Sequence, residues 1–275
     1  MNAFHLFSSD TIGSLLHNLG TSNFVLLETT KIVEKEHTSF LFTNPVEHIT
    51  CTGKDNPFLF LDQVQKKLDQ GYYLAGWFAY EFGYLIEDVL KKYSSQFSNQ
   101  VVAELGVFPP PKVFDHQLQS SSHGTWPREL IEDSKQNGHD TYHVTNVRPD
   151  RNQADYLEAI KAIKEYIAAG DTYQVNFTLK LLFDFTGSPV EFYKVLRRSQ
   201  SVCYGAYIQS HSKQIMSFSP ELFFRKKDSM CTVRPMKGTL RRGRTIEEDI
   251  EYKKFLCSDS KNRSENVMIV DLLRN

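Results

Sequence analysis

The sequence lacks long apolar runs, a strong excess of charge of either sign, and clustered cysteines. No window of its 275 residues approaches the apolar length of a membrane-spanning helix, so we expect no membrane contact. Basic and acidic side chains number 32 and 33, and the formal net charge of -1 gives no reason to expect nucleic-acid binding. With 40% hydrophobic residues, the composition favours an ordinary globular protein with an apolar core.

The cysteines and the first residues bear on the cellular compartment. The four cysteines are scattered, without the CxxC spacing of metal sites; they are Cys51, Cys203, Cys231 and Cys257. The opening stretch, MNAFHLFSSD, lacks the basic region and apolar core of a secretion signal. We therefore expect reduced thiols and a cytoplasmic protein.

The order of apolar and polar segments predicts two lobes and a connection between them. Residues 1–116 include NFVLLETTKI and YYLAGWFAYEFGYLI, which are typical of buried strands or strand–helix units. Residues 117–155 are polar, and we expect a long connection there. Residues 156–275 form the third part, in which the periodic patterns are sharper.

Helix and strand signals alternate in this third part. DYLEAIKAIKEYIAAG has helical spacing and ends at Gly170, whereas TYQVNFTLKL alternates with period two and predicts a strand. Ser188–Glu191 and Thr245–Glu248 are capping boxes that predict two helix starts. YGAYIQ and QIMSFSP predict strands, and LFFRKKDSMCTVRP predicts a hairpin that turns near Lys227 and Asp228.

SKNRSENVMIVDLLRN predicts a last helix, with one side formed by Glu265, Met268, Ile269 and Leu272. The helix stays apolar up to Asn275, with no glycine, proline or polar tail to end it. We therefore expect the chain to be incomplete on its C-terminal side.

The stretch VRPMKGTLRRG places a lysine on a stiff corner. Pro235 fixes its own backbone, and Gly238 permits a sharp turn or a close approach by another group. Three arginines lie close to Lys237 in the sequence: Arg234, Arg241 and Arg242. The stretch is either a solvated basic turn or an anion site with a reactive amine. A nucleic-acid module has only LRRGR in its support, and the balanced charge disfavours it.

Five motifs occur in order: GDTYQVNFT, YGAYI, SFSPELFF, RPMKGT and SKNRSENVMIVDLLRN. Together they resemble the chorismate-utilising enzymes, which include anthranilate synthase, isochorismate synthase and aminodeoxychorismate synthase components. The resemblance is strong from Tyr156 onward and weaker in the first lobe, at LLETTK and GWFAYEFGY. It implies an α+β fold, a multilayer α/β sandwich with large, mostly antiparallel sheets.

Lys237 divides this family, because anthranilate and isochorismate synthases usually carry alanine there and aminodeoxychorismate synthases carry lysine. The resemblance implies that Lys237 attacks the 2-position of chorismate as the 4-hydroxyl leaves, and that ammonia then displaces it at the 4-position. A lysine amine in water is neutral in roughly one molecule in two thousand at neutral pH, and only the neutral amine is nucleophilic. We expect nearby arginines and partial burial to favour the neutral form.

The same resemblance assigns roles to other residues. Glu221, in SPEL, is implied to be the general acid that protonates the departing hydroxyl. For this role its pKa would have to be raised, by burial or by neighbouring carboxylates. The substrate carboxylates would be bound by Arg234, Gly238 and Thr239, although Thr239 could instead only start a turn. Glu265 is implied to bind Mg2+, with a salt bridge to a neighbouring basic residue as the alternative.

These roles imply aminodeoxychorismate formation in p-aminobenzoate and folate synthesis. A separate glutamine amidotransferase would supply ammonia, because no glutaminase cysteine motif is visible. Anthranilate synthase component I is an alternative that Lys237 disfavours, and a non-catalytic chorismate-binding fragment is another. The family's catalytic histidine, second metal carboxylate and glycine-rich loop are not found before Asn275, so we expect the 275-residue chain alone to be inactive.

Overall fold

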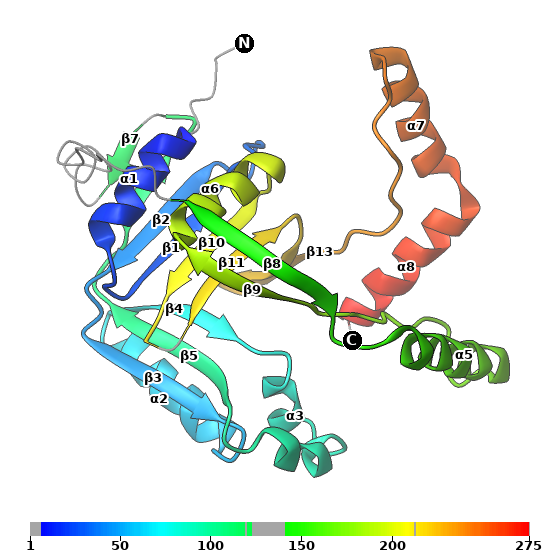
Figure 1. Cartoon of the computed structure of the whole chain (residues 1–275), viewed down its shortest axis with the longest axis horizontal. Coiled ribbons are helices and arrows are strands. Elements are labelled where there is room, and N and C mark those ends of the chain that lie inside the picture. The colour runs from blue at the N-terminus through cyan, green and yellow to red at the C-terminus, as the bar shows by residue number, and fades with distance from the viewer. Residues whose placement is uncertain (1–6, 119, 123–140, 212, 275) are drawn as a thin grey trace. The chain divides into compact units, whose positions relative to one another are not determined.

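The computed structural model describes residues 7–118, 120–122, 141–211 and 213–274, and Figure 1 shows its helices and strands. The chain forms two compact units. One consists of Met1–Ser134 and Arg197–Asn275, and the other of Lys135–Leu196. The first unit joins residues from both ends of the chain. The predicted lobes, with limits at residues 116 and 156, instead follow one another along the sequence, and these limits stay a prediction.

The larger sheet of the first unit has six antiparallel strands in the order β11-β10-β1-β2-β6-β7. They are β1 (Phe24–Glu28), β2 (Thr38–Thr43), β6 (Lys112–Asp115), β7 (Ser120–Ser122), β10 (Tyr204–Gln209) and β11 (Gln214–Ser219). Leu26 of β1 lies between Leu41 of β2 and Tyr207 of β10. The strands predicted in NFVLLETTKI, YGAYIQ and QIMSFSP are confirmed, and the first lobe shares this sheet with the later motifs.

A smaller antiparallel sheet packs against one face of the larger one. Its strands are β3 (Glu47–Thr52), β4 (Tyr73–Phe78) and β5 (Val101–Phe108), in the order β3-β5-β4. Val25, Phe42 and Ile208 of the larger sheet form a buried cluster with Ala75 and Phe108 of the smaller sheet. Burial of apolar side chains between the two sheets holds the layers together.

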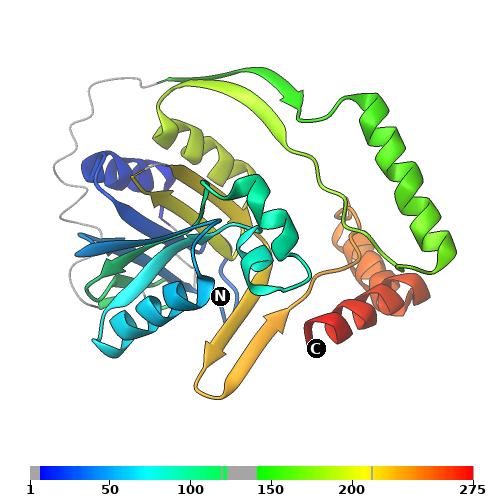
Figure 2. The same cartoon turned by 90° about the horizontal axis from the view of Figure 1, so that it is seen from below.

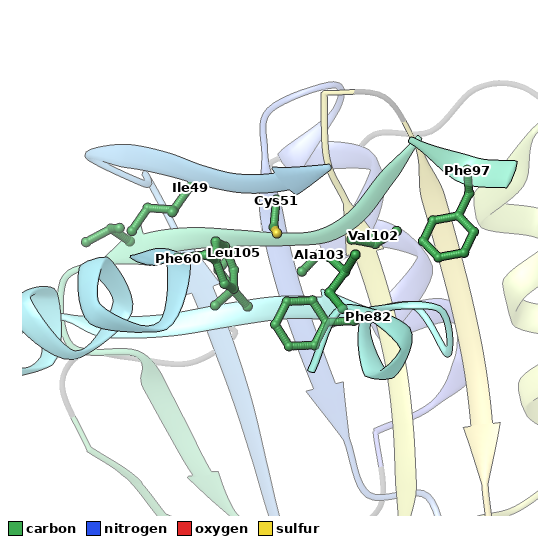
Figure 3. Close-up of a cluster of buried hydrophobic side chains, with 10 residues drawn as sticks. Ile49, Cys51, Phe60, Phe82, Phe97, Val102, Ala103 and Leu105 are labelled. Atoms are coloured by element: carbon green, nitrogen blue, oxygen red, sulfur yellow. The ribbon is translucent and has the colours of Figure 1, made fainter. Parts of the chain in front are cut away.

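Helices cover the outer faces. α2 (Pro57–Asp69), α3 (Phe82–Ile86) and the 3-10 helix η1 (Lys91–Phe97) pack on the smaller sheet through the cluster in Figure 3. Asn56 caps α2, and Pro57 occupies its first turn, where proline is favoured. α1 (Ser9–Leu19) lies beside the larger sheet in Figures 1 and 2 and buries three apolar side chains. The predicted α+β sandwich is therefore confirmed.

The rest of the first unit follows the sequence signals closely. β12 (Leu222–Lys227) and β13 (Met230–Arg234) form the predicted hairpin, and Asp228 adopts a φ of 52° at its turn. α7 (Ile246–Ser258) starts at the predicted cap, where the amide of Glu248 donates to Thr245 Oγ1 over 3.3 Å. α8 (Ser260–Arg274) is the predicted last helix.

The second unit shows one confirmed helix and one wrong strand. α5 (Gln153–Ala169) ends at Gly170, whose φ of 82° is the predicted left-handed cap. The strand predicted in TYQVNFTLKL is wrong. Of this stretch, only the last residue, Leu181, belongs to a strand, β9 (Leu181–Gly187), which pairs with β8 (Tyr142–Pro149). Alternation marks an extended segment, but a strand also needs a neighbour to accept its backbone hydrogen bonds.

Two further sequence expectations concern the polar connection and the helix that follows β9. β8 lies within the polar segment predicted as a connection, and residues 123–140 of that segment lie outside the described residues. α6 (Pro189–Ser199) begins at the predicted box, where the amide of Glu191 donates to Ser188 Oγ over 3.4 Å. Within the described ranges, no helix is both long enough and apolar enough to cross a membrane.

A pair of histidines joins the two sheets of the first unit. Asn23 Nδ2 lies 3.2 Å from His48 Nε2 and 3.1 Å from His211 Nε2, and the two imidazole centroids are 4.4 Å apart. Burial lowers the pKa of His48, the charge of His211 lowers it further, and Glu104 opposes both effects. Neutral His48 is therefore the form that the fold accommodates.

We predict that the free energy of unfolding falls as the pH drops below about 6.5, because the unfolded chain then protonates His48 and the folded chain resists it. His48→Gln should flatten this dependence. Urea unfolding at about pH 8 and about pH 5.5 measures it. His143→Gln, at an exposed histidine of β8, is the control, and an equal pH dependence in both variants would contradict the assignment.

Candidate functional site

Two predicted catalytic residues, Glu221 and Lys237, lie near each other beside the hairpin. Glu221 lies between β11 and β12, where Ser219 Oγ accepts from its amide over 3.2 Å and donates to its carbonyl over 3.0 Å. Its carboxylate oxygen Oε1 accepts from the amide of Met236 over 2.8 Å. Because Lys237 is the next residue, the fold brings the predicted acid and the predicted nucleophile into one neighbourhood.

Lys237 and Glu221 differ in their exposure to solvent. Lys237 is half-buried, and within the described chain no carboxylate pairs with its ammonium group. Glu221 is exposed, so the described residues do not supply the burial expected of a general acid. Its carboxylate is instead oriented by the backbone of the lysine loop.

The three arginines near Lys237 each hold a different group. Arg241 Nη2 donates to the Tyr252 hydroxyl over 3.1 Å, and Arg242 forms an ion pair with Asp249. Asp249 and Tyr252 lie in the first two turns of α7, so Arg241 and Arg242 both have their partners on this helix. Each of the three arginines therefore has a contact of its own, and these contacts shape the loop.

Arg234 belongs to a cluster centred on Glu36. Arg234 Nη1 lies 2.9 Å from Glu36 Oε1 and 3.4 Å from the Tyr204 hydroxyl. Arg225 donates from Nη1 to Oε1 over 3.1 Å and from Nη2 to Oε2 over 2.6 Å. Burial raises the pKa of Glu36, but hydrogen bonds from Arg225 and Tyr204 and the two arginine charges outweigh burial and lower it overall.

Sequence reasoning missed Glu36, Arg225 and Tyr204. Glu36 stands in VEKEHT, which resembles a solvated charged turn. Nothing in this stretch indicates that Glu36 is the one of its charged residues that becomes buried. The three residues also line a cavity of about 420 Å³ that reaches Glu221 and the strands β1, β2, β10 and β11. The cavity therefore joins the Glu36 cluster to the predicted acid.

Gly238 places the loop against α8. Its φ is +76°, and a Cβ atom there would lie 2.6 Å from Asn262 Oδ1. Asn262 is fixed in turn, because its amide and its Nδ2 both donate to Asp259 Oδ2, over 2.9 Å and 2.8 Å. Glu265 follows Asn262 by one helical turn and lies on the same side of α8. Thr239, the next residue of the loop, is exposed.

The metal prediction depends on Glu265, which is half-buried. No hydrogen bond or ion pair occupies its carboxylate in the described part of the chain, so the alternative of a salt bridge to Lys261 or Arg263 is not formed there. The described residues also contain no group of three or more His, Cys, Asp or Glu that could hold a metal ion. One free carboxylate with waters and substrate oxygens fits the ligands that Mg2+ prefers.

We predict that Gly238→Ala destabilises the protein more than Gly170→Ala does. Both glycines have a left-handed backbone, which costs alanine about 1–2 kcal/mol. Nothing lies within 4 Å of a Cβ at Gly170, whereas a Cβ at Gly238 must displace Asn262, at a further cost of about 1 kcal/mol or more. Urea unfolding compares the two variants, and equal losses would mean that the loop does not rest on α8.

The sequence matches the family model described as chorismate binding enzyme over residues 23–275. Aminodeoxychorismate synthase component 1 of Bacillus subtilis (strain 168) is 40% identical over 120 residues, which are 44% of this chain and 26% of that protein. The Escherichia coli (strain K12) protein of the same name is 28% identical over 241 residues, 82% of this chain and 53% of that one. Anthranilate synthase component 1 of Acinetobacter calcoaceticus is 38% identical over 126 residues, 44% and 25% of the two chains.

Among solved structures, anthranilate synthase component I from Streptococcus pneumoniae TIGR4 has a TM-score of 0.68 at 20% identity, covering 89% of this chain and 62% of that one. This likeness supports the fold alone. The chain spans between 25% and 53% of the length of the three curated relatives named above. Because the family match runs through nearly the whole sequence, the chain belongs to the chorismate binding enzyme family.

Proposed function

We propose that the protein forms 4-amino-4-deoxychorismate from chorismate and ammonia, as an aminodeoxychorismate synthase component I. The observation that carries this proposal is Lys237, the residue by which the family's reactions differ. Its half-buried position and its place beside the Glu221 contact support a catalytic role. The chemistry fits p-aminobenzoate and folate synthesis in the cytoplasm.

The reaction uses two displacements. The neutral Lys237 amine forms a C–N bond at position 2 of chorismate, both ring double bonds shift, and the bond to the 4-hydroxyl breaks. Glu221 gives its proton to that hydroxyl, which leaves as water, since hydroxide itself is a poor leaving group. Ammonia then forms a bond at position 4, and the Lys237 nitrogen departs with its electron pair. The added nitrogen loses a proton, and Glu221 is reprotonated.

Binding of the two chorismate carboxylates is assigned to the lysine loop. Nη1 of Arg234 is held by Glu36 and Tyr204, but no described residue occupies its Nε or Nη2. These donors and the exposed Thr239 hydroxyl suit a carboxylate, and Gly238 allows its close approach.

Glu265 would hold Mg2+, whose chemistry when bound is to neutralise a substrate carboxylate. A glutamine amidotransferase partner would deliver the ammonia.

Anthranilate synthase component 1 is the second candidate, since relatives with that name have similar identity, such as the 38% of the Acinetobacter calcoaceticus protein. Product identification separates the two. The full-length protein is incubated with chorismate, Mg2+ and ammonium, and the products are separated by chromatography and weighed by mass spectrometry. We expect 4-amino-4-deoxychorismate; anthranilate as the sole product would favour the second candidate.

We predict that Lys237→Ala, in the full-length protein, lowers aminodeoxychorismate formation by roughly two orders of magnitude or more, because the nucleophile is removed. Some anthranilate-type chemistry should remain, as in family members with alanine at this position. Lys227→Ala, at the exposed tip of the hairpin, is the matched control and should retain the parent rate. An unchanged product and rate in Lys237→Ala would end the nucleophile assignment.

We predict that Glu265→Gln raises the Mg2+ concentration for half-maximal activity by roughly tenfold or more, since one ligand of a hard cation is weakened. Glu251→Gln, at an exposed carboxylate of α7, is the control and should leave this concentration unchanged. Initial rates over a Mg2+ series measure the effect. The same Mg2+ dependence in Glu265→Gln and the parent would leave Glu265 without a metal role.

A further inference from the structure

Glu36 is a buried carboxylate with an unusual set of partners. It lies between β1 and β2, where its backbone exchanges two hydrogen bonds of 3.0 Å with Val33, and it is only 6% exposed. Burying a charge of this kind is costly unless other charges and hydrogen bonds compensate it. The compensation comes from a distant part of the sequence, the hairpin β12–β13.

The hairpin supplies both positive charges. Arg225 is on β12 and Arg234 is at the end of β13, and their guanidinium groups meet at the same carboxylate. The pairing of the strands is irregular between Leu222 and Arg225, next to this contact. Two guanidinium groups so close would repel each other without the carboxylate between them. Glu36 therefore holds the side chains of Arg225 and Arg234 in one arrangement.

This arrangement reaches Lys237 through a short, stiff path. Arg234 is followed by Pro235, whose φ is fixed by its ring. Met236 is then tied by its amide to Glu221, over 2.8 Å. The loop is thus fixed at two points just before Lys237: the Arg234 side chain at Glu36 and the Met236 amide at Glu221.

We propose that Glu36 is a positioning residue, which sets the orientation of Lys237 by holding the side chains of Arg225 and Arg234 where the RPMKGT loop begins. Its effect on the loop depends only on the contacts above, whereas its effect on catalysis rests on the function proposed for Lys237. Glu36 acts through Arg234 and does not itself touch the substrate.

A second buried ion pair of the same unit provides a matched comparison. Glu28 is 1% exposed, and Arg197 contacts it from Nε over 3.0 Å and 2.9 Å and from Nη2 over 2.7 Å. Glu28, like Glu36, is a buried carboxylate with a bidentate arginine partner, but this pair includes no residue of the hairpin or the lysine loop. A purely structural role of Glu36 would make the two pairs equivalent.

The test measures hydrogen exchange of the peptide 233–240 in the full-length protein by mass spectrometry. Glu36→Gln should speed exchange of this peptide by roughly fivefold or more, as expected when a local contact is lost. Glu28→Gln should leave it within about twofold of the parent, although both variants lose the charge of a buried carboxylate. In the same preparations, kcat with chorismate and ammonium should fall in Glu36→Gln much more than in Glu28→Gln.

Equal exchange in Glu36→Gln and the parent, or equal loosening in the two variants, would overturn the positioning role. Arg225→Met is the second variant, in case Glu36→Gln does not fold, because the Arg225 side chain is 45% exposed and easier to replace. It should also speed exchange of the peptide, and an unchanged rate would count against the proposal. Exchange needs no turnover, so a protein that makes no aminodeoxychorismate would refute the proposed function and leave this inference testable.

Discussion

The carboxylate of Glu36, buried between the guanidinium groups of Arg225 and Arg234, is the contact on which the geometry of the site depends. It joins a loop near the start of the chain to a hairpin near its end. Such a pair contributes little net free energy once desolvation is counted, but removing one partner leaves an uncompensated charge. Its main consequence is therefore a fixed arrangement of the loop that follows Arg234.

The six-stranded sheet provides the frame for that contact. β1 pairs with β10, and β10 with β11, so that the segment after β11 begins from a rigid edge. Glu221 lies two residues beyond β11 and meets the amide of Met236. On the other side, Gly238 rests against Asn262 at the start of α8. The residues that flank Lys237 are thus held by a sheet, by the ion pair of Arg234 with the buried Glu36, and by a helix.

Local signals in the sequence were sufficient for much of the fold. The caps of α5, α6 and α7 and the hairpin turn at Asp228 were predictable, because capping and turn formation depend on residues a few positions apart. The strand predicted in TYQVNFTLKL was wrong, because pairing depends on a distant strand that alternation cannot reveal. Glu36 was not predictable for the same reason: its arginine partners lie 189 residues away or farther in the sequence.

The central claim is that the amine of Lys237 becomes covalently bound to the substrate. Incubating the full-length protein with chorismate and Mg2+ but no ammonium should let the first displacement proceed and prevent the second. Digestion and mass spectrometry should then find the peptide that carries Lys237 heavier by chorismate less one water. Unmodified Lys237, in a preparation that makes 4-amino-4-deoxychorismate once ammonium is added, would contradict the account.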